Sequence, residues 1–206
     1  MAKLKKQLLV EGKDDCHVIL SLCAKFEILQ TFEVVNCEGF DKLAGRFSQT
    51  FKLPDIECVE VIMDADVSIA DRWISIQHTL AKLGFNSPSS LPESGLILTN
   101  DEDKKVGVWI MPNNNSNGML EDFLKFLIPP NDKLFPIAYD TIEYIERNEL
   151  NKYSDYHKSK VVLHTWLAWQ EKSGLPFGQA ITNRYLTTED ETCQKLVQWL
   201  KDLFDA

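Results

Sequence analysis

Apolar and polar positions follow two alternating periods over the first half of the chain. Short runs of apolar residues, many of them β-branched, are typical of buried strands and occupy residues 7–12, 32–37 and 57–66. Each run is followed by a stretch with apolar residues three and four positions apart, typical of a helix that packs on one side: from residue 13 onward, 40–51 and 70–83. Strands that alternate with helices of this length predict an α/β fold with a doubly wound, mainly parallel sheet.

The pattern changes in the second half. Two more strands are predicted at 96–98 and 106–111, on either side of an acidic turn, and a polar loop then leads to a helix beginning near residue 119. From Pro129 onward the strand pattern disappears, and we predict helices over 139–149, 153–171, 178–185 and 189–204. The tryptophans of this part, Trp166, Trp169 and Trp199, are expected to pack against the sheet. We therefore predict an α/β domain over residues 1–128 and a helical extension over 129–206 packed on the same core.

Two carboxylates close the third predicted strand, in the segment Val61-Ile62-Met63-Asp64-Ala65-Asp66. On an extended chain Asp64 and Asp66 point to the same side, and the carboxyl ends of strands in such sheets face the crevice where ligands bind. Like charges held this close resist joint ionisation unless a cation lies between them, which favours a hard ion such as Mg²⁺. An ordinary Asp-rich turn explains this hexapeptide alone equally well.

Other acids are expected at the same edge of the sheet. Glu11 ends the first strand, and Gly12 permits a tight turn that leaves its carboxylate at the crevice. Asp15 follows in the first turn of the next helix, and Glu121 lies in the first turn of the helix after the last strand. Acids in a first helical turn also stabilise the helix without any ligand, so neither position is diagnostic by itself.

Composition limits the possible partners. With 22 Lys and Arg against 31 Asp and Glu, the net charge is −9, so we expect the isolated chain to bind nucleic acid weakly. No apolar run approaches the roughly 20 residues that span a bilayer, which predicts no membrane partner. Five cysteines without CxxC spacing argue against a zinc site and favour reduced thiols and a cytoplasmic location.

In this order, the acidic residues resemble the toprim (topoisomerase–primase) domain, whose pattern is a strand-terminal Glu-Gly followed by Asp-x-Asp at another strand tip. The matching segments are Leu8-Leu9-Val10-Glu11-Gly12 and Ile62-Met63-Asp64-Ala65-Asp66. The resemblance implies a toprim/Rossmann-like fold in which one or two Mg²⁺ or Mn²⁺ ions are held among these carboxylates. It also implies that Glu11 can act as general acid or base.

Within that group, Val10-Glu11-Gly12-Lys13-Asp14-Asp15 is similar to the OLD-family (overcoming lysogenization defect) nucleases. There an acid four residues after the Glu joins the site, which corresponds to Asp15, and Gly118-Met119-Leu120-Glu121 is similar to a later Gly-x-x-Glu segment. Almost the whole chain also resembles small stand-alone toprim-like proteins of prokaryotes, of uncharacterised function. OLD nucleases carry an ATPase domain, and the loop Gly-x-x-x-x-Gly-Lys-Ser/Thr is not found here, so we expect any ATPase partner to be a separate protein.

These observations predict a metal-dependent nuclease that hydrolyses phosphodiester bonds in nucleic acid. The predicted site consists of metal ligands and a lysine that neutralises charge on the phosphate: Glu11, Asp15, Asp64, Asp66, Glu121 and Lys160. A solvated helical lysine is the ordinary alternative for Lys160. No tyrosine can be identified as a nucleophile. Two other functions stay open: a receiver-like phospho-acceptor domain, and a metal-binding regulatory or defence-complex subunit that acts only with a partner.

Overall fold

The computed structural model describes residues 5–204 and places five strands in a single sheet. The strands are β1 (Lys6–Val10), β2 (Glu33–Asn36), β3 (Cys58–Asp64), β4 (Leu96–Thr99) and β5 (Lys105–Met111). Their order across the sheet is β2-β1-β3-β5-β4, and all neighbours are parallel except the antiparallel pair β4–β5. This confirms the predicted α/β fold with a mainly parallel sheet.

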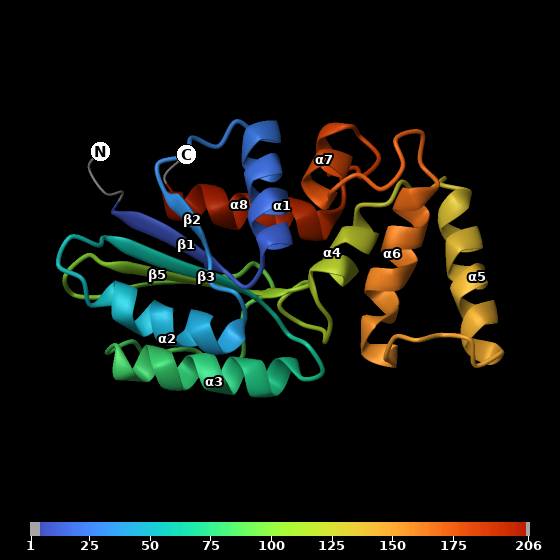
Figure 1. Ribbon diagram of the computed structural model, residues 1–206. Helices are drawn as coiled ribbons and strands as arrows, with labels where there is room; N and C mark the ends of the chain where they lie inside the picture. The colour runs from blue at the N-terminus through green and yellow to red at the C-terminus, as the bar shows by residue number, and fades with distance from the viewer. Residues whose placement is uncertain (1–4, 205–206) are drawn as a thin grey trace.

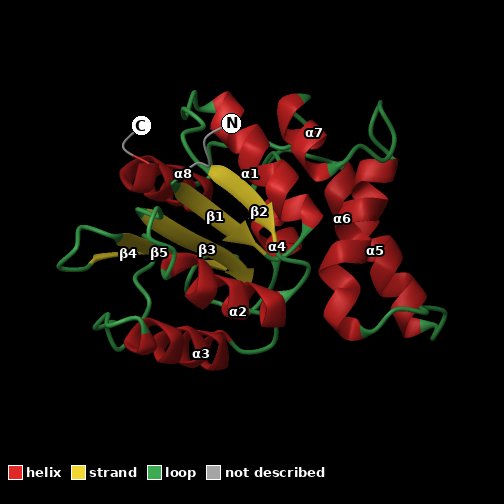
Figure 2. Cartoon of the chain, turned by 60° about the vertical axis from the view of Figure 1, so that its left-hand side comes forward, coloured by secondary structure: helices red, strands yellow, loops and turns green. Residues whose placement is uncertain are grey.

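Helices cover both faces of the sheet (Figures 1 and 2). α1 (Lys13–Lys25) and the C-terminal α8 (Glu191–Phe204) pack on one face, and α2 (Phe40–Phe51) and α3 (Ile69–Lys82) pack on the other. Each face therefore has its own apolar core, and the central strand β3 is buried on both sides along all but its last residue. This explains why its sequence reads as a nearly continuous apolar run.

The register of the parallel strands brings their carboxyl ends together. Val10 of β1 is paired with Ile62 of β3, and Ile62 is paired with Trp109 of β5. Glu11 follows the first of these strands directly, and Asp64 is the last residue of the second. The two acids that carry the sequence argument thus lie on adjacent strands at one edge of the sheet.

The part of the chain after β5 is helical. It contains α4 (Leu120–Phe126), α5 (Leu134–Arg147), the short 3₁₀ helix η1 (Asp155–His157), α6 (Lys158–Ala168) and α7 (Phe177–Thr182), before α8 returns to the sheet. α5 and α6 lie side by side at one end of the molecule (Figures 1 and 2). The division into residues 1–128 and 129–206 stays a prediction. None of the described helices combines the length and the apolar composition needed to cross a bilayer.

All four helices predicted after Pro129 have bounds that differ from the prediction, and α5 and α6 differ most. α5 begins at Leu134, five residues before the predicted start. Pro136 does not prevent this, because it lies in the first turn of the helix, where its missing N–H costs no hydrogen bond. α6 begins at Lys158, after the short η1, and not at residue 153, and it ends at Ala168 and not at residue 171. Trp166 and Trp199 are buried as predicted, but the prediction for Trp169 is wrong: it lies just beyond the end of α6 and is 41% exposed.

Candidate functional site

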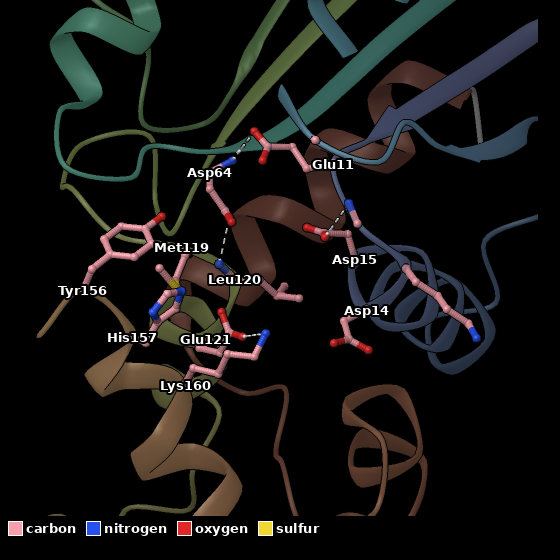
Figure 3. Close-up of a pocket in the computed structure, with 13 residues that line it drawn as sticks. Glu11, Asp14, Asp15, Asp64, Met119, Leu120, Glu121, Tyr156, His157 and Lys160 are labelled. Atoms are coloured by element: carbon pink, nitrogen blue, oxygen red, sulfur yellow. Dashed lines mark hydrogen bonds and ion pairs between the residues drawn. The ribbon is translucent and has the colours of Figure 1, made fainter. Parts of the chain in front are cut away.

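A pocket of about 310 Å³ lies at the carboxyl ends of β1 and β3. Figure 3 shows acidic side chains that reach it from several elements of the chain. Five of the six predicted site residues line this pocket: Glu11, Asp15, Asp64, Glu121 and Lys160. The sixth, Asp66, does not.

Hydrogen bonds to the backbone fix two of the carboxylates. Glu11 accepts a hydrogen bond through Oε1 from the backbone N–H of Asp64, at 3.3 Å. Asp64 in turn accepts one through Oδ1 from the backbone N–H of Leu120, at 2.8 Å. The end of β1, the end of β3 and the start of α4 are therefore joined through side chains of the pocket itself.

Only one oxygen of the Asp15 carboxylate has a hydrogen-bond partner. Its Oδ2 accepts a hydrogen bond from the backbone N–H of Gly12 at 3.0 Å, as expected for an acid in the first turn of α1. Its Oδ1 is buried and has no hydrogen-bond partner. A buried carboxylate oxygen without a partner is costly, so it calls for a proton or a cation.

Burial raises the pKa of these carboxyl groups. It brings the pKa of Glu11 to about 7, where the nearby Arg72 charge lowers it and the Asp66 charge raises it further. For Asp64, burial is again the main cause, reinforced by the charges of Asp15 and Glu11, and the pKa of Asp15 is raised for the same reasons. At neutral pH the cluster therefore favours retained protons, or a bound cation that replaces them.

Glu121 and Lys160 form the opposite wall of the pocket. The Glu121 side chain is 7% exposed, and its Oε1 lies 3.5 Å from Nζ of Lys160. The lysine side chain is 47% exposed, so its ammonium group can leave this pair for another anion. Its location agrees with the predicted role, and the role itself stays a prediction.

Asp66 lies beside the pocket and has its own partners. The chain is no longer extended there, because Asp66 has φ +55° and its backbone forms two hydrogen bonds with Gly118. The alternation that would place Asp64 and Asp66 on one side ends with β3. The Asp66 carboxylate accepts hydrogen bonds from Arg72 and from the hydroxyl of Tyr156. Its predicted part in metal binding stays a prediction.

Sequence reasoning missed three residues of this region: Arg72, Tyr156 and His157. The last two line the pocket, and Tyr156 is 90 positions from Asp66 along the chain. No local pattern marks Arg72, and the only sign for Tyr156 and His157 is their place just before the segment Lys158-Ser159-Lys160. Burial and the bond to Asp66 raise the pKa of Tyr156, so its hydroxyl stays protonated and acts as a donor.

The donor set suits a hard cation, although the ligands are not assembled around one. Carboxylate oxygens are the ligands that Mg²⁺ and Mn²⁺ prefer, and the unpartnered Asp15 oxygen fits such an ion. Within residues 5–204, no group of three or more His, Cys, Asp or Glu side chains is arranged to hold a metal ion.

Comparisons with known proteins give one family and a small set of similar structures. A family model described as "Protein of unknown function (DUF3226)" matches residues 5–205, whereas no curated protein matches the sequence significantly. Solved structures of the C-terminal region of the Xanthomonas campestris pv. campestris OLD protein resemble the chain over its full length. The mercury-phased structure is 12% identical and the iodine-phased one 15%, each covering 100% of this chain and 98% of that chain with a TM-score of 0.49. At these identities and TM-scores the likeness is a resemblance in overall fold and says nothing of the chemistry.

Proposed function

Because the chain belongs to the DUF3226 family, whose function is unknown, its activity has to be inferred from its own residues, and we propose a divalent-metal-dependent nuclease that hydrolyses phosphodiester bonds. The observation that carries this proposal is the convergence of Glu11, Asp15 and Asp64 on one pocket. Their burial raises all three pKa values, and one Asp15 oxygen lacks any partner. Such a cluster weakens the fold unless it binds something positive.

The residues that would hold Mg²⁺ or Mn²⁺ are Glu11, Asp15 and Asp64, with Glu121 on the opposite wall of the pocket and Asp66 beside it. One or two ions are proposed. Such ions supply charge that polarises a phosphate and makes a water molecule a better nucleophile.

The chain's own residues would bind the substrate and move protons. Glu11, with a pKa of about 7, can accept or release a proton at its carboxylate near neutral pH, as a general acid or base must. Lys160 would contact a phosphate oxygen; its position in the lining of the pocket and its half-exposed side chain support this role. That contact would neutralise charge that develops on the phosphate.

The net charge of −9 favours a second form of the same proposal, in which the chain acts only with a partner. A more basic subunit, or a separate ATPase of the kind that OLD proteins carry on one chain, would supply the affinity for nucleic acid that this chain lacks. In its extreme form this alternative is a regulatory or defence-complex subunit that binds the metal but does not cleave.

Cleavage assays test the proposal. Purified protein is incubated with single- and double-stranded DNA and RNA in Mn²⁺, Mg²⁺ or EDTA, with and without co-purified proteins. We expect metal-dependent cleavage that falls by orders of magnitude in Asp64→Ala. Asp140→Ala, which removes an exposed carboxylate on α5, should cleave like wild type. Cleavage that resists EDTA, or equal activity of the two variants, would exclude the proposed site.

A further inference from the structure

The start of α6 and the turn before it contact three acids, one just after β3 and two in the first turn of α4. Tyr156, Ser159 and Lys160 are spaced three and four residues apart, so they lie on one side of this helical segment. The Tyr156 hydroxyl donates to Asp66, the Lys160 ammonium group pairs with Glu121, and the Ser159 hydroxyl donates to Asp122 at 2.6 Å. Figure 3 shows Tyr156 and Lys160 facing the pocket.

Lys158 holds the same segment to its neighbour helix. Its Nζ pairs with the carboxylates of Glu143 and Glu146, both on α5, and the second of these distances is 2.7 Å. α5 therefore holds this segment on one side, while three of its side chains contact Asp66 and the first turn of α4 on the other. This arrangement fixes where the Tyr156 hydroxyl lies.

The Asp66 carboxylate is held from two directions. Arg72 donates to Oδ2 and Tyr156 donates to Oδ1. Arg72 is itself fixed, because its side chain is only 13% exposed and its guanidinium carbon lies 3.7 Å from the centre of the Phe40 ring. The Asp66 backbone is fixed as well, by hydrogen bonds of 2.8 and 2.9 Å to and from Gly118.

The backbone of Asp66 has a defined conformation as well. Its φ of +55° lies in the left-handed region, which aspartate enters more readily than most residues, at a cost of about 1 kcal/mol. Each carboxylate oxygen has two acceptor sites and keeps one free after accepting these hydrogen bonds. Carboxylates that bind metals are commonly oriented in this way by a second layer of donors.

We propose that Tyr156 and Arg72 are positioning residues, which orient the Asp66 carboxylate toward a divalent cation held by Asp64. This inference rests on the metal site of the proposed function. The site is then assembled from three regions: the end of β3, the first turns of α3, and the helical segment that begins at η1. The helical part contributes to ion binding as well as to packing.

The test compares two tyrosines that stand three residues apart. Tyr156→Phe removes the hydroxyl that donates to Asp66 and keeps the ring. Tyr153→Phe is the matched control, because the Tyr153 hydroxyl also donates to a carboxylate, that of Glu146 at 3.0 Å, but does so outside the pocket. Mn²⁺ affinity is measured without nucleic acid, by titration with electron spin resonance of the free ion, and melting is followed in EDTA.

We expect Tyr156→Phe to weaken Mn²⁺ binding by about 10- to 100-fold, with a melting temperature in EDTA close to that of Tyr153→Phe. Tyr153→Phe should bind Mn²⁺ like wild type. Arg72→Lys gives an independent measurement, since a lysine does not reproduce the planar guanidinium, and it should also weaken binding.

Each outcome distinguishes this inference from the proposed function. Wild-type affinity in Tyr156→Phe and in Arg72→Lys would overturn the positioning role and leave the metal site standing. Equal weakening in both tyrosine variants would also overturn it, because the effect would then belong to the segment in general. Failure of the wild-type protein to bind Mn²⁺ would overturn the metal site itself, and this inference with it.

Discussion

Glu60 is a carboxyl group buried in the middle of the central strand β3, four residues before its acidic tip. One carboxylate oxygen contacts the Cys58 thiol, and the other has no hydrogen-bond partner. Burial raises its pKa from 4.5 to about 8, although Cys58 and the charges of Lys6 and Lys105 act in the opposite direction. Glu60 therefore holds a proton in the folded protein at neutral pH.

This proton makes stability depend on pH. Because the pKa of Glu60 is higher in the folded state, the folded protein binds more protons between pH 4.5 and 8, and stability falls as the pH rises through that window. Glu60→Gln removes this contribution, so its free energy of unfolding should decline less steeply than that of wild type. Urea unfolding near both ends of the window measures the difference. Equal slopes for the two proteins would show that Glu60 does not hold a proton.

For single residues, the sequence was enough to predict which acids lie at strand ends and in first helical turns. Glu11 and Asp64 follow from the strand pattern, and the parallel sheet brings such ends together. The surroundings of Asp66 could not be predicted, because they depend on a left-handed backbone and on a tyrosine 90 residues away. Whether these carboxylates share an ion stays a prediction.

At the scale of helices and strands, the packing of α8 against the sheet depends on one glycine, Gly95. Trp199 of α8 donates through Nε1 to the backbone oxygen of Leu96, at 3.1 Å. Gly95, just before β4, has φ +83°, and a Cβ atom there would lie 2.7 Å from that same nitrogen. No larger residue fits under the indole without moving the helix.

We therefore expect Gly95→Ala to destabilise the protein more than Gly84→Ala does. Gly84 also has a positive φ, +86°, but nothing lies within 4 Å of a Cβ atom there. The control should lose about 1–2 kcal/mol from backbone strain, and Gly95→Ala should lose about 1–3 kcal/mol more from overpacking. Urea unfolding of both variants gives the comparison. Similar losses would mean that Trp199 and α8 adjust without cost.

Element boundaries were predictable where the apolar period is strong. The helix predicted over 40–51 is α2 without any shift, and the acidic turn does join an antiparallel pair, β4 and β5. The later helices shifted because other local features decide their ends. Pro136 is accommodated inside the first turn of α5, and α6 stops at Ala168, which leaves Trp169 exposed.

For the whole molecule, the acidic charge sets the expected affinity for nucleic acid. With a net charge of −9, the isolated chain should bind DNA or RNA no more tightly than a Kd of about 10⁻⁶ M at physiological salt, and more weakly as salt rises. Fluorescence anisotropy over a salt series measures both quantities. Tight binding that is insensitive to salt, with no other protein present, would contradict this expectation.

The central claim is that the carboxylates of the pocket share a cation, and thermal melts of wild type and Asp64→Asn test it most directly. The asparagine keeps an oxygen that can accept from Leu120 and removes a charge whose burial is costly. In EDTA the variant should therefore be as stable as wild type or more so. Asp140→Asn, on the exposed side of α5, serves as the control.

Millimolar Mn²⁺ should reverse this order. An ion that binds only the folded state adds about 2.7 kcal/mol at 100 times its Kd, and Asp64→Asn should lose much of that gain while Asp140→Asn keeps it. The account predicts a rise in melting temperature with Mn²⁺ for wild type that is small or absent in Asp64→Asn. An equal rise in both proteins, or no rise in wild type, would contradict a shared metal site.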